Sequence, residues 1–162
     1  MNVLVAGVGN VFLGDDGFGA EVARRLAREA VPAGVEVTDF GIRGIHLAYR
    51  LLEPLSLLVV ADLARRGGPP GTLYVIEPDL GALPPGGADA HGFDLPSVFA
   101  AVKDLGGRLP PVRIVGCEPA SVEEGMGLSP PVEAAVGPAV ALVREIAASG
   151  AGTGRGYEEE RA

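Results

Sequence analysis

The 162-residue sequence predicts an α/β fold, a three-layer sandwich of about five mostly parallel strands with helices on both faces. Short runs of β-branched residues alternate with longer segments of helical period, which is typical of βα units around a parallel sheet. Apolar residues make up 48% of the chain, enough for one self-sufficient core. The expected strands are Asn2–Val8, Val35–Phe40, a very apolar run from Leu55 that ends at Asp62, Thr72–Pro78 and Val112–Glu118.

Apolar residues at helical spacing predict the first two helices. One extends from about residue 17 to residue 30 and has Val22 and Leu26 four positions apart. The other covers residues 44–53, and the spacing of Ile45, Tyr49 and Leu52 predicts that these three side chains form its apolar side.

Capping residues mark the starts of the two later helices. Asp94 precedes a helix that extends to about Leu105 and has Pro96 in its first turn. Ser129 precedes a long helix that begins Pro130-Pro131 and carries valines four apart. Residues 80–92, between the expected strand Thr72–Pro78 and Asp94, are rich in Gly and Pro. They predict a long loop, a kind of segment that is often functional.

The chain is expected to form one domain over residues 1–148, followed by a disordered tail over residues 149–162 that is rich in glycine and charge. The formal charge of -8 argues against a nucleic-acid-binding protein. No apolar run is long enough to span a bilayer, and no basic leader precedes the first strand, so we expect a soluble, cytoplasmic protein. The single cysteine, Cys117, excludes an internal disulfide and is expected to be a buried core thiol.

The first loop poses a chemical question. Gly7-Val8-Gly9 after a strand resembles the start of a dinucleotide-binding loop, but Phe12 stands where the third glycine belongs. Two aspartates, Asp15 and Asp16, stand at the start of the helix instead. One carboxylate is enough to cap a helix, so we expect one of the pair to cap and the other to face outward, ionised and able to bind a cation.

Ligands of such sheets bind outside the carboxyl ends of the strands, which selects two more residues. Asp62 ends the most apolar strand, where an unpaired charge is costly, although a cap or an ion pair with Arg65 or Arg66 would also explain it. His91 lies in the long loop. With Asp16 and Asp62 it would complete a ligand set suited to Zn²⁺, Ni²⁺ or Fe²⁺.

Other polar residues carry weaker signals. Arg43 follows the second strand and either lines the cleft or is a solvated loop charge. His46 is expected at the surface. No G-x-S-x-G elbow is present to indicate a serine nucleophile.

Four segments, in order along the chain, resemble the maturation endopeptidases of nickel-iron hydrogenases: GVGNVFLGDDGFG, LLVVADLA, DAHG and VGCEPASVEEGMGLSPPVEAAV. The resemblance extends from Asn2 to about Ala148 and implies a twisted sheet between helices. It implies removal of a short C-terminal extension from the hydrogenase large-subunit precursor after nickel insertion. The metal ligands that it implies map to Asp16, Asp62 and His91, with aspartate at a position where some members have glutamate.

The resemblance also implies that Asp39 and Gly41, the D-x-G of the loop after the second strand, belong to the substrate cleft, with Arg43 beside them. We expect nickel to be carried by the substrate, and Zn²⁺ or Cd²⁺ to be able to occupy the same ligands in vitro. The expected partner is the large-subunit precursor, and the expected state is a monomer.

Two other functions stay open at this point. Gly7-Val8-Gly9 is compatible with a non-catalytic, Rossmann-like nucleotide-binding module, although Phe12, Asp15 and Asp16 count against it. The ligand set is also compatible with a generic hydrolase that holds its own Zn²⁺.

Overall fold

A computed structural model describes residues 2–81, 94–150 and 159–161. Within these ranges one six-stranded sheet has the order β2-β1-β3-β5-β4-β6. Strands β1 (Val3–Val8), β2 (Val35–Gly41), β3 (Leu57–Leu63) and β5 (Val112–Cys117) are parallel, and β4 (Leu73–Glu77) is antiparallel to β5. The α/β sandwich and its mostly parallel sheet are therefore as predicted.

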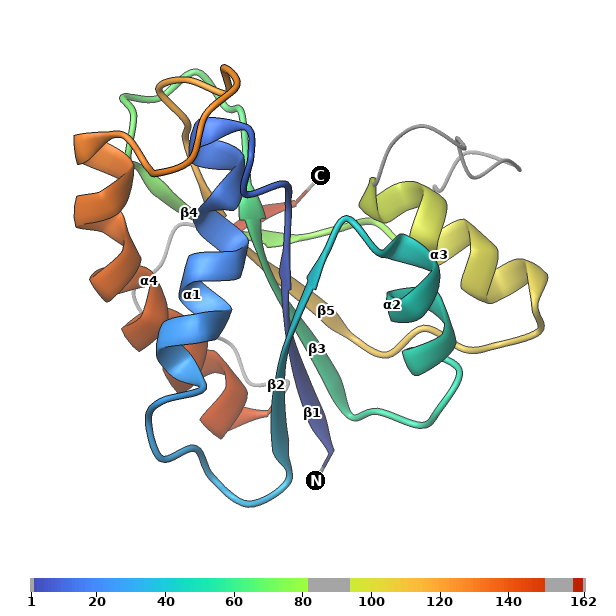
Figure 1. Cartoon of the computed structure of the whole chain (residues 1–162). Coiled ribbons are helices and arrows are strands. Elements are labelled where there is room, and N and C mark those ends of the chain that lie inside the picture. The colour runs from blue at the N-terminus through green and yellow to red at the C-terminus, as the bar shows by residue number, and fades with distance from the viewer. Residues whose placement is uncertain (1, 82–93, 151–158, 162) are drawn as a thin grey trace.

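The helices cover both faces of the sheet (Figure 1). Helices α1 (Phe18–Leu26) and α4 (Pro130–Ser149) lie on one face, and α2 (Gly44–Arg50) and α3 (Leu95–Asp104) lie on the other. A short 3₁₀ turn, η1 (Gly14–Gly17), precedes α1. No helix among the described residues is long and apolar enough to cross a membrane.

Alternate residues of each central strand contribute to two separate cores. Val3 and Val5 of β1 pack with α1 and α4, whereas Leu4 and Ala6 pack with α2 and α3. Strand β3 repeats this alternation. Because successive side chains of a strand point to opposite faces, a strand that is buried on both faces must be apolar at nearly every position. Cys117 is fully buried in the first of these cores, as expected.

Helix α2 differs from the prediction, because it turns a different side to the sheet. Its buried residues are Leu47 and Ala48, followed by Leu51, while Ile45 and Tyr49 are about 60% exposed. Both stripes are apolar, and spacing alone does not say which of them the chain turns inward when it leaves β2.

The two later helices begin where predicted. Asp94 caps α3: its carboxylate accepts hydrogen bonds from the amide and the hydroxyl of Ser97 at 2.7 and 2.9 Å. Ser129 precedes α4 but makes no side-chain cap, because its hydroxyl donates to Asp15 instead.

Residues 159–161 differ from the expectation of a disordered tail. Glu159–Arg161 forms β6, which pairs in parallel with β4 at the edge of the sheet. The other tail residues after Gly150 lie outside the described ranges.

Candidate functional site

The order of the strands defines where a ligand can bind. From β1 the chain passes outward to β2 and then returns across β1 to β3, so the strand order reverses between β1 and β3. In open α/β sheets, ligands bind outside the carboxyl ends of the strands at such a switch point. Asp16 follows β1 and Asp62 is the last residue but one of β3, so both predicted acids lie at the carboxyl ends of the two strands that flank the switch point.

Asp16 is held in a closed loop between β1 and α1. The backbone amide of Asn10 donates to Asp16 Oδ2 at 2.9 Å, and the amides of Leu13 and Asp16 donate to the carbonyls of Asn10 and Leu13 at 3.1 Å each. Asp16 as a residue is partly exposed.

Asp62 is chemically the most perturbed acid of the site. Burial, and to a smaller extent the negative charge of Asp16, raise the pKa of Asp62 to about 7 from an ordinary value of 3.8. One hydrogen bond, from the amide of Leu63 to Oδ1 at 2.7 Å, favours the charged form but does not offset the other two effects. The two carboxylates therefore repel each other, an arrangement that a bound cation would relieve.

Asp15 does not do what the sequence suggested. Neither it nor Asp16 caps α1 with its side chain. Asp15 is 1% exposed and accepts hydrogen bonds from the amides of Ala120, Ser121 and Ser129 at 2.8, 3.0 and 2.7 Å, and from the Ser129 hydroxyl at 2.8 Å. Burial alone would raise the pKa of Asp15, but these bonds outweigh it and lower the pKa. The aspartate pair thus divides into one buried acid, Asp15, and one partly exposed acid, Asp16.

The loop after β1 is not built for a phosphate. The amide of Gly9 donates to the carbonyl of Gly41, that of Asn10 to Asp16, and that of Phe12 to the side chain of Asn10. A phosphate would need such amides free. The loop glycines make room for the chain itself: a Cβ on Gly9, at φ +129°, would lie 2.0 Å from the Asp16 carbonyl oxygen.

The predicted cleft residues at the end of β2 and just after it form a tight turn next to this loop. Asp39 Oδ1 accepts from the Gly41 amide at 2.8 Å, and the Arg43 guanidinium donates to the carbonyls of Phe40 and Asp39 at 3.2 and 2.8 Å. Since Gly9 donates to the Gly41 carbonyl, the turn adjoins the β1 loop. Arg43 is thus exposed and bound to its own turn.

His91 lies outside the described residues, so its place relative to Asp16 and Asp62 stays a prediction. Within residues 2–81, 94–150 and 159–161, no three acidic, histidine or cysteine side chains form a metal-binding group. His46 is exposed on α2, as expected.

Sequence reasoning overlooked Glu118, which directly follows β5. Its Oε1 accepts from the amides of Arg66 and Gly68 at 2.8 and 3.0 Å and from the Tyr74 hydroxyl at 2.9 Å. Burial opposes its charge, yet these hydrogen bonds lower the pKa of Glu118 overall. The only signal in the sequence was an acid immediately after an apolar strand, the same signal that selected Asp62.

Fold and site together define a class: a small α/β protein with two neighbouring carboxylates, Asp16 and Asp62, at the β1/β3 switch point. The sequence model of the hydrogenase maturation protease family matches residues 20–146. The chain belongs to this family, which makes it a member of a family of endopeptidases, as the resemblance implied.

Relatives and solved structures agree. The chain is 30% identical to the hydrogenase 2 maturation protease of Escherichia coli (strain K12), over 88% of each protein. It is 34% identical to the hydrogenase expression/formation protein HupD of Rhodobacter capsulatus, over 91% of this chain and 72% of that one. The hydrogenase maturating endopeptidase HybD from E. coli superposes with a TM-score of 0.73 at 27% identity, covering 93% of this chain and 94% of that one.

A second solved structure extends the comparison. The hydrogenase 2 maturation peptidase from Thaumarchaeota archaeon SCGC_AB-539-E09 superposes with a TM-score of 0.71 at 33% identity, covering 91% of this chain and 99% of that one.

Proposed function

We propose that the protein is an endopeptidase that removes the C-terminal extension of a nickel-iron hydrogenase large-subunit precursor after nickel insertion. Family membership supports the peptidase activity and its link to hydrogenase maturation. The observation that carries the proposed site is the carboxylate pair at the switch point, where burial and the Asp16 charge raise the pKa of Asp62.

In this proposal nickel arrives as part of the substrate and is bound by Asp16, Asp62 and His91. A nickel-loaded precursor would bring a cation between two carboxylates that otherwise repel each other, whereas an empty precursor would leave that repulsion in place. Selectivity for the loaded precursor follows from this difference in charge. Zn²⁺ and Cd²⁺ accept the same nitrogen and oxygen ligands, and we expect them to occupy the site in vitro.

Cleavage itself is the addition of water to the carbonyl of the scissile peptide. The water oxygen bonds to the carbonyl carbon, a proton leaves that water, the carbon–nitrogen bond breaks and the departing amine gains a proton. Two routes fit the residues. Either the bound metal polarises the carbonyl or the water, or the metal serves recognition and a carboxylate takes the proton.

Exposed apolar side chains near the site offer a surface for a large partner. Phe12 is 63% exposed in the loop that leads to Asp16, and Met126 is 75% exposed in the segment paired with that loop. Ile42 is 62% exposed in the turn after β2. We propose that the precursor covers these side chains and that one monomer acts on one precursor.

The test is incubation of the protein with a large-subunit precursor, with and without nickel, followed by mass spectrometry. We expect a small mass loss with nickel, and none when His91→Ala replaces the wild type. Cleavage without nickel would retain the peptidase and refute substrate-borne recognition. Near-stoichiometric Zn²⁺ in the purified protein would favour a resident metal instead.

A further inference from the structure

The neighbour of Asp16 is a buried carboxylate whose bonds all reach one distant segment. The four donors to Asp15 come from Ala120, Ser121 and Ser129, more than 100 positions along the chain. Three of the four donors are backbone amides, so Asp15 holds the backbone of that segment in place and not merely one side chain. Burying a carboxylate is costly unless it is fully hydrogen-bonded, and here both of its oxygens accept.

The backbone just before Asp15, and that of Asp15 itself, pairs with the same segment. Gly14 donates to the Gly125 carbonyl at 2.9 Å, Gly125 donates to the Phe12 carbonyl at 2.8 Å, and Asp15 donates to the Ser121 carbonyl at 2.9 Å. The loop that carries Asp16 is therefore fastened to residues 120–129 from Phe12 to Asp15. In Figure 1 this orange segment lies beside the blue turn that precedes α1.

Asp16 has little support of its own. Among the described residues, its carboxylate accepts one hydrogen bond, from the Asn10 amide. The position of the Asp16 carboxylate therefore depends on the backbone of the loop. Asp15, the residue before it, fastens that backbone to residues 120–129.

We infer that Asp15 is a positioning residue: it fixes the Asp16 loop against residues 120–129 and so holds the Asp16 carboxylate near Asp62. The inference rests on the proposed function for the role of Asp16, but the geometry that it predicts can be measured without activity. Adjacent aspartates thus have complementary tasks, one structural and buried, the other facing the ligand.

The substitution Asp15→Asn tests this with almost no change in shape. An amide has one acceptor oxygen where the carboxylate has two, so its NH₂ must face at least one of the amide or hydroxyl donors. Ser129→Ala is the milder variant, because it removes only the hydroxyl bond and keeps the three amide bonds.

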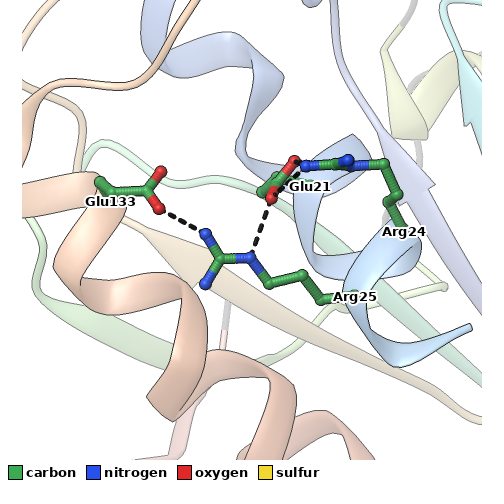
Figure 2. A network of polar contacts seen from close by, with 4 residues as sticks. All are labelled: Glu21, Arg24, Arg25 and Glu133. Atoms are coloured by element: carbon green, nitrogen blue, oxygen red, sulfur yellow. Dashed lines mark hydrogen bonds and ion pairs between the residues drawn. The ribbon is translucent and has the colours of Figure 1, made fainter. Parts of the chain in front are cut away.

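A matched control is available in a second link between the α1 and α4 regions. Arg25 bridges Glu21 of α1 and Glu133 of α4, while Arg24 also binds Glu21 (Figure 2). This link is exposed and lies beyond the Asp16 loop. Glu133→Gln breaks the Arg25–Glu133 ion pair without touching Asp15.

The experiment measures kcat and KM for cleavage of nickel-loaded precursor, together with hydrogen exchange of the Asn10 amide, in wild type and in Asp15→Asn, Ser129→Ala and Glu133→Gln. We expect Asp15→Asn to lower kcat at least tenfold with a smaller change in KM, and to speed Asn10 exchange at least tenfold. Ser129→Ala should also lower kcat and speed Asn10 exchange, but by less than Asp15→Asn. Glu133→Gln should change neither quantity.

The other possible results also test the positioning role of Asp15. Wild-type kcat and Asn10 protection in Asp15→Asn would overturn the inference, as would an equal loss of kcat in a Glu133→Gln variant of the same thermal stability. If Asp15→Asn does not fold, Ser129→Ala is the test: a lower kcat with faster Asn10 exchange supports the inference, and wild-type values of both overturn it. If the wild type cleaves no precursor, the proposed function fails, and Asn10 exchange alone tests the positioning role.

Discussion

Replacing Asp62 by asparagine is expected to stabilise the protein at alkaline pH while abolishing its activity. Burial and the Asp16 charge disfavour the ionised form of Asp62, so its pKa is raised in the folded protein but not in the unfolded chain. Folding must therefore oppose the loss of the Asp62 proton. The sign follows from linkage: below a pH of 3.8 the group is protonated in both states, and stability is lost as pH rises from there toward 7.

The size of the effect follows from the two pKa values. A rise from 3.8 to about 7 corresponds to roughly 4 kcal/mol of destabilisation once the group is fully ionised, since each pKa unit is worth about 1.4 kcal/mol. At pH 5 only roughly 1.5 to 2 kcal/mol of this is felt, because the folded protein is still protonated there. Asparagine is neutral at every pH, and its side-chain oxygen can still accept from the Leu63 amide.

The assay is urea unfolding of wild type and Asp62→Asn in parallel from pH 5 to pH 8, without added metal. Groups that do not interact with Asp62 contribute alike in both proteins, so the difference between their free energies of unfolding reports on Asp62 and its coupling to Asp16. We expect the advantage of the variant to grow by roughly 2 to 3 kcal/mol over this range. An advantage that does not change with pH, or that shrinks, would refute the electrostatic account of Asp62.

Three further predictions concern the surroundings of the site. Gly9→Ala should destabilise the fold and abolish cleavage, since its Cβ would lie 2.0 Å from the Asp16 carbonyl oxygen, whereas Gly67→Ala, also at positive φ but in open space, should cost only about 1 kcal/mol in thermal unfolding. Glu118→Gln should lose stability at neutral pH but little at low pH. The pKa of Glu118 is lower in the folded protein than in the unfolded chain, so its ionised carboxylate stabilises the fold at a pH above the unfolded pKa, and this gain is lost on acidification. Urea midpoints of the variant and the wild type at two pH values check this. Phe12→Ser should raise KM for the precursor about tenfold or more, while the equally exposed Leu105→Ser at the end of α3 leaves it unchanged; an equal rise in both would refute the docking surface.

The fold and the two acids could be predicted because their signals are local. Parallel strands buried on both faces need nearly continuous apolar runs, and such runs locate β1, β3 and β5 directly. An acid at the end of such a run, as at Asp62, stands out against its neighbours. Topology then brings Asp62 and Asp16 to the same edge of the sheet, because the carboxyl ends of parallel strands share one edge.

The errors have a common cause, which is that the partner lies far away in the sequence. Asp15 looked like a helix cap because its own segment offers amides, but its donors come from residues 120–129. The hydrogen-bond donors to Glu118 likewise come from distant residues, in the turn after β3 and at Tyr74 of β4. For α2, two apolar stripes compete, and only packing against the sheet selects Leu47 over Ile45.

The most direct test of the central claim is single-turnover cleavage of nickel-loaded precursor by wild type, Asp16→Asn and Asp62→Asn, with Glu133→Gln as the folded control. If the carboxylate pair at the switch point is the functional site, each aspartate variant should lose at least a hundredfold in rate, although Asp62→Asn is the more stable protein at pH 8. The control should keep the wild-type rate. Cleavage at near wild-type rate by either aspartate variant would contradict the assignment of the site.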